Sequence, residues 1–251
     1  MKQTIVLIHG AWHWGGCFQK VATLLAARGH SVIHPDLKSH GFDPAIYDQV
    51  EDMADYTASV AALLEGAHEP FVLLGHSMGG VSLTYLAEKY PEKISKLIYL
   101  AAFMTPPGTS ANDYLLSEGY TNDPSVEALF EIVNATPDGK GVALNVDDVR
   151  RVRSSFYGDC SDRDVAVAAA NVARINATAP YAARIDTTKE RYGSIPRVFI
   201  ECTKDLALPI AQQRLMQADV PGAEVVTIET SHSPFFSQPA QLAEIIGAAI
   251  S

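Results

Sequence analysis

One serine stands where the chain could perform nucleophilic catalysis. Ser77 is the central residue of Gly75-His76-Ser77-Met78-Gly79, and the two glycines leave room for a sharp backbone turn around it. A buried-strand pattern at 71–74 precedes this motif, and a helical pattern at 81–87 follows it. Strand, tight turn and helix together expose a nucleophilic serine at the edge of a sheet. The motif therefore predicts that Ser77 attacks an acyl carbon.

His232 is the candidate base that would activate Ser77. A serine hydroxyl attacks well only when a neighbouring base accepts its proton. The chain has eight histidines, but only His232 follows residue 76, and chains with this motif place the acid and then the base after the nucleophile. His232 follows the last predicted strand, in a loop that can bring the imidazole over Ser77. The alternative is a solvated loop histidine without a catalytic role.

Asp205 is the candidate acid that would orient His232. The acid of such a triad fixes the imidazole tautomer and stabilises the imidazolium that forms on proton transfer. Asp205 follows the predicted strand at 197–201, and enough residues separate it from His232 for one helix and one strand. Glu201 is the nearest rival, but it is still at the end of the strand and is aimed less well. The alternative for Asp205 is a surface or helix-capping aspartate.

Acyl transfer also needs donors for the negative charge that develops on the carbonyl oxygen. A preorganised donor of this kind is worth on the order of 3 kcal/mol. The first candidate is the backbone N–H of Met78, which directly follows the nucleophile. The second is the N–H of Ala11, in the glycine-containing loop 9–16 after the first predicted strand.

Short apolar runs alternate with amphipathic segments, which is the pattern of a parallel sheet covered by helices. The runs are rich in Val, Ile and Leu, as expected of strands buried on both faces. Six strands are predicted, at 4–8, 31–34, 71–75, 96–101, 197–201 and 224–228. Helices are predicted at 17–28, 53–65, 78–89, 210–218 and 238–249. The fold class is therefore α/β, with a mostly parallel six-stranded sheet flanked by helices.

The interval 106–189 interrupts this alternation. It contains Pro106-Pro107-Gly108, a turn-like segment at 137–141 and an alanine-rich helix candidate at 162–176. Because structureless loops of this length are rare in compact domains, the interval is expected to form an inserted cap. The cap would lie over the carboxyl edge of the sheet, on a core made by 1–105 and 190–251 within one structural domain.

The composition is that of an ordinary globular protein. The 251 residues are 47% hydrophobic, and no apolar run approaches the roughly 20 residues of a membrane span. The net charge of −10 argues against nucleic acid and anionic membranes as partners. Three scattered cysteines favour a reducing cytoplasm rather than a disulfide framework or a metal site. The sequence leaves the oligomeric state open, with a homodimer as one alternative.

Paired histidines give no reason to expect a metal. His9 and His13 are spaced i, i+4, and so are His30 and His34. Metal ligands with this spacing belong on a helix with an acidic partner, whereas these residues are at strand ends without one. Neither a metal nor any other cofactor is expected.

With these residues assigned, the sequence resembles the small α/β-hydrolases that include plant methylesterases, plant hydroxynitrile lyases and bacterial esterase relatives. The resemblance spans the whole chain and rests on the segments 7–13, 75–80, 101–104, 192–196, 202–205 and 231–232. Segment 156–160 looks like the bacterial branch. The resemblance implies an α/β-hydrolase fold with the triad Ser77, Asp205 and His232 and the oxyanion donors Ala11 and Met78.

Two positions separate the two chemistries of this family. Its lyases resemble one another in having Thr after the first-strand His and Lys directly after the catalytic His. This chain has Gly10 and Ser233 there. Gly10 leaves space for a carbonyl oxygen to reach the oxyanion donors, and without a lysine a leaving cyanide has no cationic partner. Ester hydrolysis is therefore favoured over cyanohydrin cleavage.

The sequence predicts a serine carboxylesterase that hydrolyses small or aromatic esters, including methyl esters or carbamates, through an acyl-enzyme. The expected pocket is mostly apolar. Its candidate residues are Gly10, Trp12, Phe103, Met104, Phe156, Tyr157 and Ser233, with Tyr114, Leu115, Leu116, Leu129 and Phe130 from the cap. Two alternatives stay open: a cofactor-free hydroxynitrile lyase, and a non-catalytic binding protein on a hydrolase scaffold.

Overall fold

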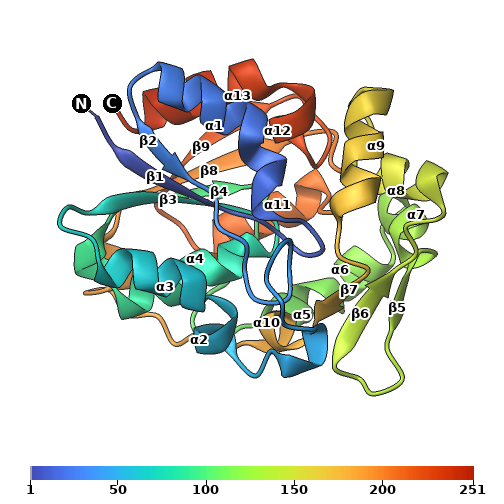
Figure 1. The fold of residues 1–251 in the computed structure, drawn as a ribbon. Helices are drawn as coiled ribbons and strands as arrows, with labels where there is room; N and C mark the ends of the chain where they lie inside the picture. Colours follow the sequence, from blue (N-terminus) through green and yellow to red (C-terminus); the bar gives the residue numbers. More distant parts are fainter. Residues whose placement is uncertain (1) are drawn as a thin grey trace.

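A six-stranded parallel sheet forms the centre of the protein. The structure is a computed structural model and describes residues 2–251. The strands lie in the order β2-β1-β3-β4-β8-β9 (Figure 1). They are β1 (Thr4–Ile8), β2 (Ser31–Ile33), β3 (Phe71–His76), β4 (Ile94–Leu100), β8 (Arg197–Cys202) and β9 (Ala223–Ile228). The predicted fold class is confirmed, and each predicted core strand agrees with the structure to within about two residues.

Helices cover both faces of this sheet. In Figure 1, α1 and α13 lie side by side on one face, and α3 and α4 lie on the other. The core helices are α1 (Gln19–Ala27), α2 (Met53–Tyr56), α3 (Ala58–Glu65), α4 (Gly79–Lys89), α11 (Ile210–Asp219), α12 (Pro234–Ser237) and α13 (Pro239–Ala249). Short 3₁₀ turns complete the core at Gly15–Phe18, Tyr47–Gln49, Pro91–Lys93 and Tyr192–Ser194. Within residues 2–251, no helix has the length and apolar character to span a membrane.

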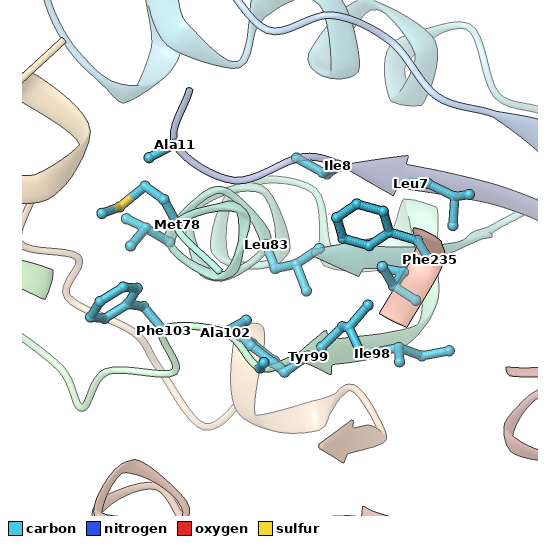
Figure 2. Packing of buried hydrophobic residues seen from close by; sticks show 14 of the residues in the cluster. Leu7, Ile8, Ala11, Met78, Leu83, Ile98, Tyr99, Ala102, Phe103 and Phe235 are labelled. Carbon is cyan, nitrogen blue, oxygen red and sulfur yellow. The ribbon is translucent and has the colours of Figure 1, made fainter. Parts of the chain in front are cut away.

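The central strands are buried because helices exclude water from both of their faces. Strands β1 and β3 are paired in register from Ile5 opposite Val72 to Ile8 opposite Gly75, and these residues are almost fully buried. The edge strand β9 is far more exposed. Figure 2 shows part of the packing between the sheet and α4, in which Tyr99 of β4 faces the helix and its hydroxyl lies 2.9 Å from that of Thr84. Burial of this kind contributes roughly 25 cal/mol per Å² of apolar surface.

The cap is a small α+β unit inserted between β4 and β8. Three short strands form its antiparallel sheet, in the order β5-β6-β7. Its strands β5 and β6 and the helices α7, α8 and α9 lie at the right of Figure 1, and α5 and α10 lie at the lower centre near α2. Its elements are α5 (Ala111–Leu115), α6 (Glu118–Thr121), a 3₁₀ turn (Pro124–Val126), α7 (Glu127–Phe130), β5 (Val133–Ala135), β6 (Gly141–Leu144), α8 (Val149–Phe156), α9 (Asp162–Asn171), β7 (Ile175–Ala177) and α10 (Ala179–Ala182).

The predicted helix at 162–176 is wrong in its second half. Helix α9 ends at Asn171, Val172 is extended, and Ile175–Ala177 forms strand β7. Pairing with β6 and a hydrogen bond from the Ala173 N–H to the Trp12 carbonyl oxygen (2.7 Å) override the helical propensity of the alanines. The predicted helix at 53–65 is likewise two helices, divided at Thr57, whose hydroxyl donates to the Met53 carbonyl.

Gly80 allows helix α4 to pack directly against the segment that follows β4. A Cβ atom on Gly80 would collide with the backbone carbonyl oxygen of Phe103, which cannot move as a side chain can. Phe103 is tied to the turn that carries Ser77, since its N–H donates to the Ser77 carbonyl oxygen at 3.0 Å. The close approach of helix and strand therefore requires glycine at this position.

We expect Gly80→Ala to lower the free energy of unfolding by about 1–3 kcal/mol, the usual range for overpacking. The measurement is urea unfolding followed by circular dichroism. Gly247→Ala is the matched control, because Gly247 is also helical and its Cβ would lie at ordinary contact distance, 3.5 Å from the Arg28 guanidinium. That control should gain up to about 1 kcal/mol from helix propensity. Equal effects of the two changes would contradict the proposed packing constraint.

Candidate active site

Ser77 lies in a strained turn between β3, which ends at His76, and α4, which begins at Gly79. Its φ angle of 54° is in the left-handed region, which costs a non-glycine residue about 1–3 kcal/mol. Two hydrogen bonds hold the turn: the Ser77 N–H donates to the Leu100 carbonyl at 3.2 Å, and the Ser77 carbonyl accepts from Phe103. Strain maintained by the surrounding backbone is typical of a residue held for chemistry.

Asp205 and His232 form a buried, hydrogen-bonded pair. Nδ1 of His232 donates to Oδ2 of Asp205 at 2.6 Å, and both side chains are almost fully buried. The other carboxylate oxygen accepts from the backbone N–H groups of Ala207 and Leu208, each at 2.8 Å. These contacts fix the carboxylate, so that the Nε2 atom of His232 is left as the free basic nitrogen.

Glu201, the rival acid, is engaged elsewhere. Its carboxylate accepts hydrogen bonds from Arg214 (2.9 and 3.2 Å), Gln217 (3.1 Å) and Thr227 (3.0 Å). The hydrogen bond from Arg214 is the main reason that the pKa of Glu201 is lowered. Glu201 therefore stabilises the packing of α11 against β8 and β9, while Asp205 faces the imidazole.

One cavity brings Ser77 and His232 together with Ala11 and Met78. Its empty volume is about 840 Å³, the open mouth included. The backbone N–H groups of Ala11 and Met78 have no acceptor within residues 2–251, so both are free to bind an oxyanion. Figure 2 shows Ala11 and Met78 near each other at one end of the buried cluster.

The cavity wall is almost entirely apolar and comes from both the core and the cap. No lining residue within 2–251 carries a carboxylate, an ammonium or a guanidinium group. Besides Ser77, His232, Ala11 and Met78, the wall is made by Trp12, Phe103, Asn112, Leu115, Leu116, Tyr120, Leu129, Phe130, Val133, Val142, Phe156, Thr178, Tyr181, Ala207 and Leu208.

The predicted pocket residues divide into two groups. Trp12, Phe103 and Phe156 line the cavity, together with the cap residues Leu115, Leu116, Leu129 and Phe130. The others lie behind the wall: Gly10, Met104, Tyr157, Ser233 and, in the cap, Tyr114. Tyr157 turns inward to hydrogen-bond His13, and Tyr114 bonds Asp219. Met104 and Ser233 are fully buried.

Gly10 shapes the site through backbone packing and does not line the cavity. A Cβ atom at this position would lie 2.7 Å from the Ser77 Cβ and 2.9 Å from the His76 carbonyl oxygen. Glycine therefore lets the loop after β1 pass directly against the turn that carries Ser77. This contact keeps the Ala11 N–H near Ser77.

Several lining residues carried no recognisable signal in the sequence. Ala207 and Leu208 lie just past Asp205, and their N–H groups also hold that carboxylate. Tyr120 and Tyr181 come from cap segments without strand or helix periodicity long enough to orient them. The one hint in the sequence was that Ala207 and Leu208 closely follow Asp205, which places them near the site.

Segment 156–160 of the cap contacts two of the loops around the site. The Tyr157 hydroxyl lies 2.9 Å from Nε2 of His13 in the loop after β1. Asp159 accepts hydrogen bonds from the N–H (3.1 Å) and hydroxyl of Ser231, directly before His232. One cap segment therefore holds both the loop that carries Ala11 and the loop that carries His232.

Three histidines beneath the site are buried in the neutral form. Nδ1 of His13 donates to the Ala11 carbonyl (2.9 Å), so its Nε2 must accept from the Tyr157 hydroxyl. His76 donates from Nε2 to the His232 carbonyl at 2.8 Å. His9 donates to the Gly10 carbonyl and accepts from the Leu37 N–H. Within residues 2–251, no cluster of His, Cys, Asp and Glu is arranged to hold a metal.

Desolvation disfavours the charged form of these histidines. Burial lowers the pKa of His13 to about 4, while its hydrogen bond to the Ala11 carbonyl opposes the shift and the nearby His232 and His40 add to it. Burial also lowers the pKa of His9 and His76 well below the usual range. The site is thus built on neutral imidazoles with fixed tautomers.

Comparison with known proteins agrees with this geometry. Residues 5–245 match the model of the alpha/beta hydrolase family. A pyrethroid hydrolase from Sphingobium wenxiniae is 37% identical over 96% of this chain and 85% of its own length. Methylesterase 1 of Arabidopsis thaliana is 33% identical over 97% of this chain and 94% of its own. The crystal structure of a pyrethroid hydrolase from Sphingobium faniae JZ-2 superimposes with a TM-score of 0.88, at 33% identity, over 99% of this chain and 97% of that one.

The chain belongs to the alpha/beta hydrolase family. The resemblance to plant methylesterases and bacterial esterases is confirmed, and the protein is a carboxylic ester hydrolase.

We expect the protein to lose stability as the pH falls from 6.5 towards 4. In this range the unfolded chain binds protons that the buried His13 does not, so the free energy of unfolding must decrease. His13 alone accounts for about 3 kcal/mol at the acid end. Urea unfolding at pH 7.5, 6 and 5 measures the loss. His13→Gln should remove the share of His13 and leave the shares of His9 and His76, whereas the same change at the exposed His68 should leave the dependence unaltered. A His13→Gln profile parallel to that of the wild type would contradict the assignment.

Proposed function

We propose that the protein is a serine esterase in which Ser77 is the nucleophile, His232 the base and Asp205 the acid. The observation that carries the proposal is the 2.6 Å hydrogen bond between Asp205 and His232. His232 lines the same cavity as Ser77, whose backbone is in a strained conformation. Neighbouring free N–H groups at Ala11 and Met78 support the same chemistry, since they provide two donors for an oxyanion.

In the first half-reaction, Nε2 of His232 accepts the Ser77 hydroxyl proton while Oγ forms a bond to the ester carbonyl carbon. The carbonyl oxygen becomes an oxyanion that the Ala11 and Met78 N–H groups bind. As the tetrahedral intermediate collapses, the bond to the alcohol oxygen breaks, and His232 donates its proton to the departing alcohol.

In the second half-reaction, water replaces the alcohol. His232 accepts a proton from water as the water oxygen attacks the acyl carbon. A second oxyanion forms in the same position, the Ser77 ester bond breaks, and the proton returns to Oγ. The carboxylic acid is released, and Asp205 stabilises the imidazolium in both halves.

The proposed substrates are uncharged carboxylic esters with bulky apolar or aromatic groups. The wall of aromatic and aliphatic side chains favours apolar ligands. A charged substrate would lose its hydration without finding a counterion. Relatives named as a pyrethroid hydrolase and a methylesterase support this class, within which aryl esters, methyl esters and related carbamates fall.

We expect Ser77→Ala to reduce kcat on aryl and methyl esters by at least about 10³-fold, because the acyl-enzyme can no longer form. The measurement is steady-state hydrolysis of a panel of nitrophenyl, methyl and naphthyl esters. Ser82→Ala is the matched control, since Ser82 is buried on α4 and its hydroxyl has no partner within residues 2–251. Ordinary turnover by Ser77→Ala would rule out the mechanism.

We expect Asp205→Asn to lower kcat by about 10³–10⁴-fold, because the amide favours the wrong imidazole tautomer. Glu201→Gln should keep kcat within a few-fold and instead reduce the melting temperature, since it weakens the contact with Arg214. Kinetics and thermal unfolding of the two variants side by side make the test. If Glu201→Gln lost more turnover than Asp205→Asn, the acid would be misassigned.

A further inference from the structure

The loop that carries Ala11 is attached to the cap through Trp12. The Trp12 N–H donates to Oδ1 of Asn176 at 3.2 Å. Its carbonyl oxygen accepts from the Ala173 N–H at 2.7 Å, and its indole N–H donates to the Val142 carbonyl at 3.0 Å. The backbone N–H, the carbonyl oxygen and the indole N–H of Trp12 therefore all bond to the cap. Their partners lie on strands β6 and β7 or just before β7.

Trp12 needs this support because its backbone is strained. Its φ angle is 59°, in the left-handed region, which a bulky residue occupies at a cost of about 1–3 kcal/mol. The peptide plane between Ala11 and Trp12 carries the Ala11 carbonyl oxygen, which accepts from Nδ1 of His13, and the Trp12 N–H. Relaxation of Trp12 would turn this plane and displace Ala11, so that the N–H of Ala11, which belongs to the preceding peptide, would move with its residue.

The side chain of Asn176 is held in one orientation by its neighbours in the cap and the core. The residue is fully buried on β7. Its Nδ2 donates to the Ala177 carbonyl at 2.9 Å, which fixes the orientation of the amide. Its Oδ1 also lies 2.7 Å from Nε2 of the buried His40, whose Nδ1 lies 3.0 Å from the Lys38 carbonyl oxygen. The acceptor is therefore held in place before it meets the Trp12 N–H.

We propose that Asn176 is a positioning residue of the oxyanion site: through Trp12, it makes the Ala11 donor depend on docking of the cap sheet. The inference rests on the proposed function, because it assumes that Ala11 binds the oxyanion. Asn176 does not line the cavity and does not touch substrate. Its loss should weaken stabilisation of the transition state and leave ground-state binding largely unchanged.

The test compares Asn176→Ala and Asn176→Val with the wild type on a nitrophenyl ester. We expect kcat to fall by about 10–100-fold with KM within about threefold, a partial loss of one oxyanion donor. Val fills most of the volume of Asn and suits a strand, so it keeps the test usable if Ala unfolds the protein. Asn134→Ala is the control, because Asn134 is an exposed asparagine on β5 of the same sheet.

Two further measurements separate positioning from general destabilisation. A trifluoromethyl ketone, which forms a tetrahedral oxyanion on Ser77, should bind the variants about 10–100-fold more weakly, while a non-reacting alcohol of the same shape should bind as it does to wild type. Asn176→Asp retains an acceptor for the Trp12 N–H and should recover at least part of the lost kcat. Unchanged kcat in both Asn176→Ala and Asn176→Val, or equal weakening of ketone and alcohol, would overturn the inference.

Failure of the proposed function is distinguishable from failure of this inference. A wild type without esterase activity, or a Ser77→Ala variant with ordinary turnover, would contradict the proposed function whatever the Asn176 variants do.

Discussion

The site depends on three backbone segments packed so closely that side chains are excluded between them. The turn after β3 carries Ser77, the loop after β1 passes against it at Gly10, and the segment after β4 meets α4 at Gly80. Hydrogen bonds from Ser77 to Leu100 and from Phe103 to Ser77 join two of these segments. Because the contacts are between backbones, they cannot be relaxed by a rotamer change. The left-handed conformation of Ser77 is therefore maintained by the carboxyl ends of three parallel strands at once.

Neutral imidazoles fill the space beneath this arrangement. His9, His13 and His76 each donate a ring N–H to a backbone carbonyl oxygen, and two of those carbonyl groups belong to Gly10 and Ala11. Such bonds orient loops that contain glycine and would otherwise be free to move. This arrangement persists only while the rings remain uncharged, because a charged imidazole is unfavourable in a buried position. Stability at acid pH is thereby limited by the same residues that shape the site.

The sequence was sufficient to predict the core because its signals are local. The buried-strand runs and the Gly75–Gly79 motif each occupy only a few consecutive residues. The chain order of Ser77, Asp205 and His232 follows from the topology of the fold. In the structure, Ser77 and His232 line one cavity and Asp205 lies directly behind it. The cap was predicted only as an insertion. Strands β5, β6 and β7 have three or four residues each, too few to show a period, and β7 interrupts what reads as one alanine-rich helix. The contact of Asn176 with Trp12 joins residues far apart in the chain, so no local pattern could indicate it.

The cap divides its residues between two tasks. Tyr157, Asp159 and Asn176 bond the loops of the core, and none of them lines the cavity. Leu115, Leu116, Leu129 and Phe130 line the cavity, on helices α5 and α7 or directly after α5. Evolution can therefore change the shape of the cavity on one set of residues while the other set is kept constant. A designer who wished to redirect the enzyme to new esters would find in α5 and α7 a surface open to variation, and in Tyr157, Asp159 and Asn176 three positions to leave alone.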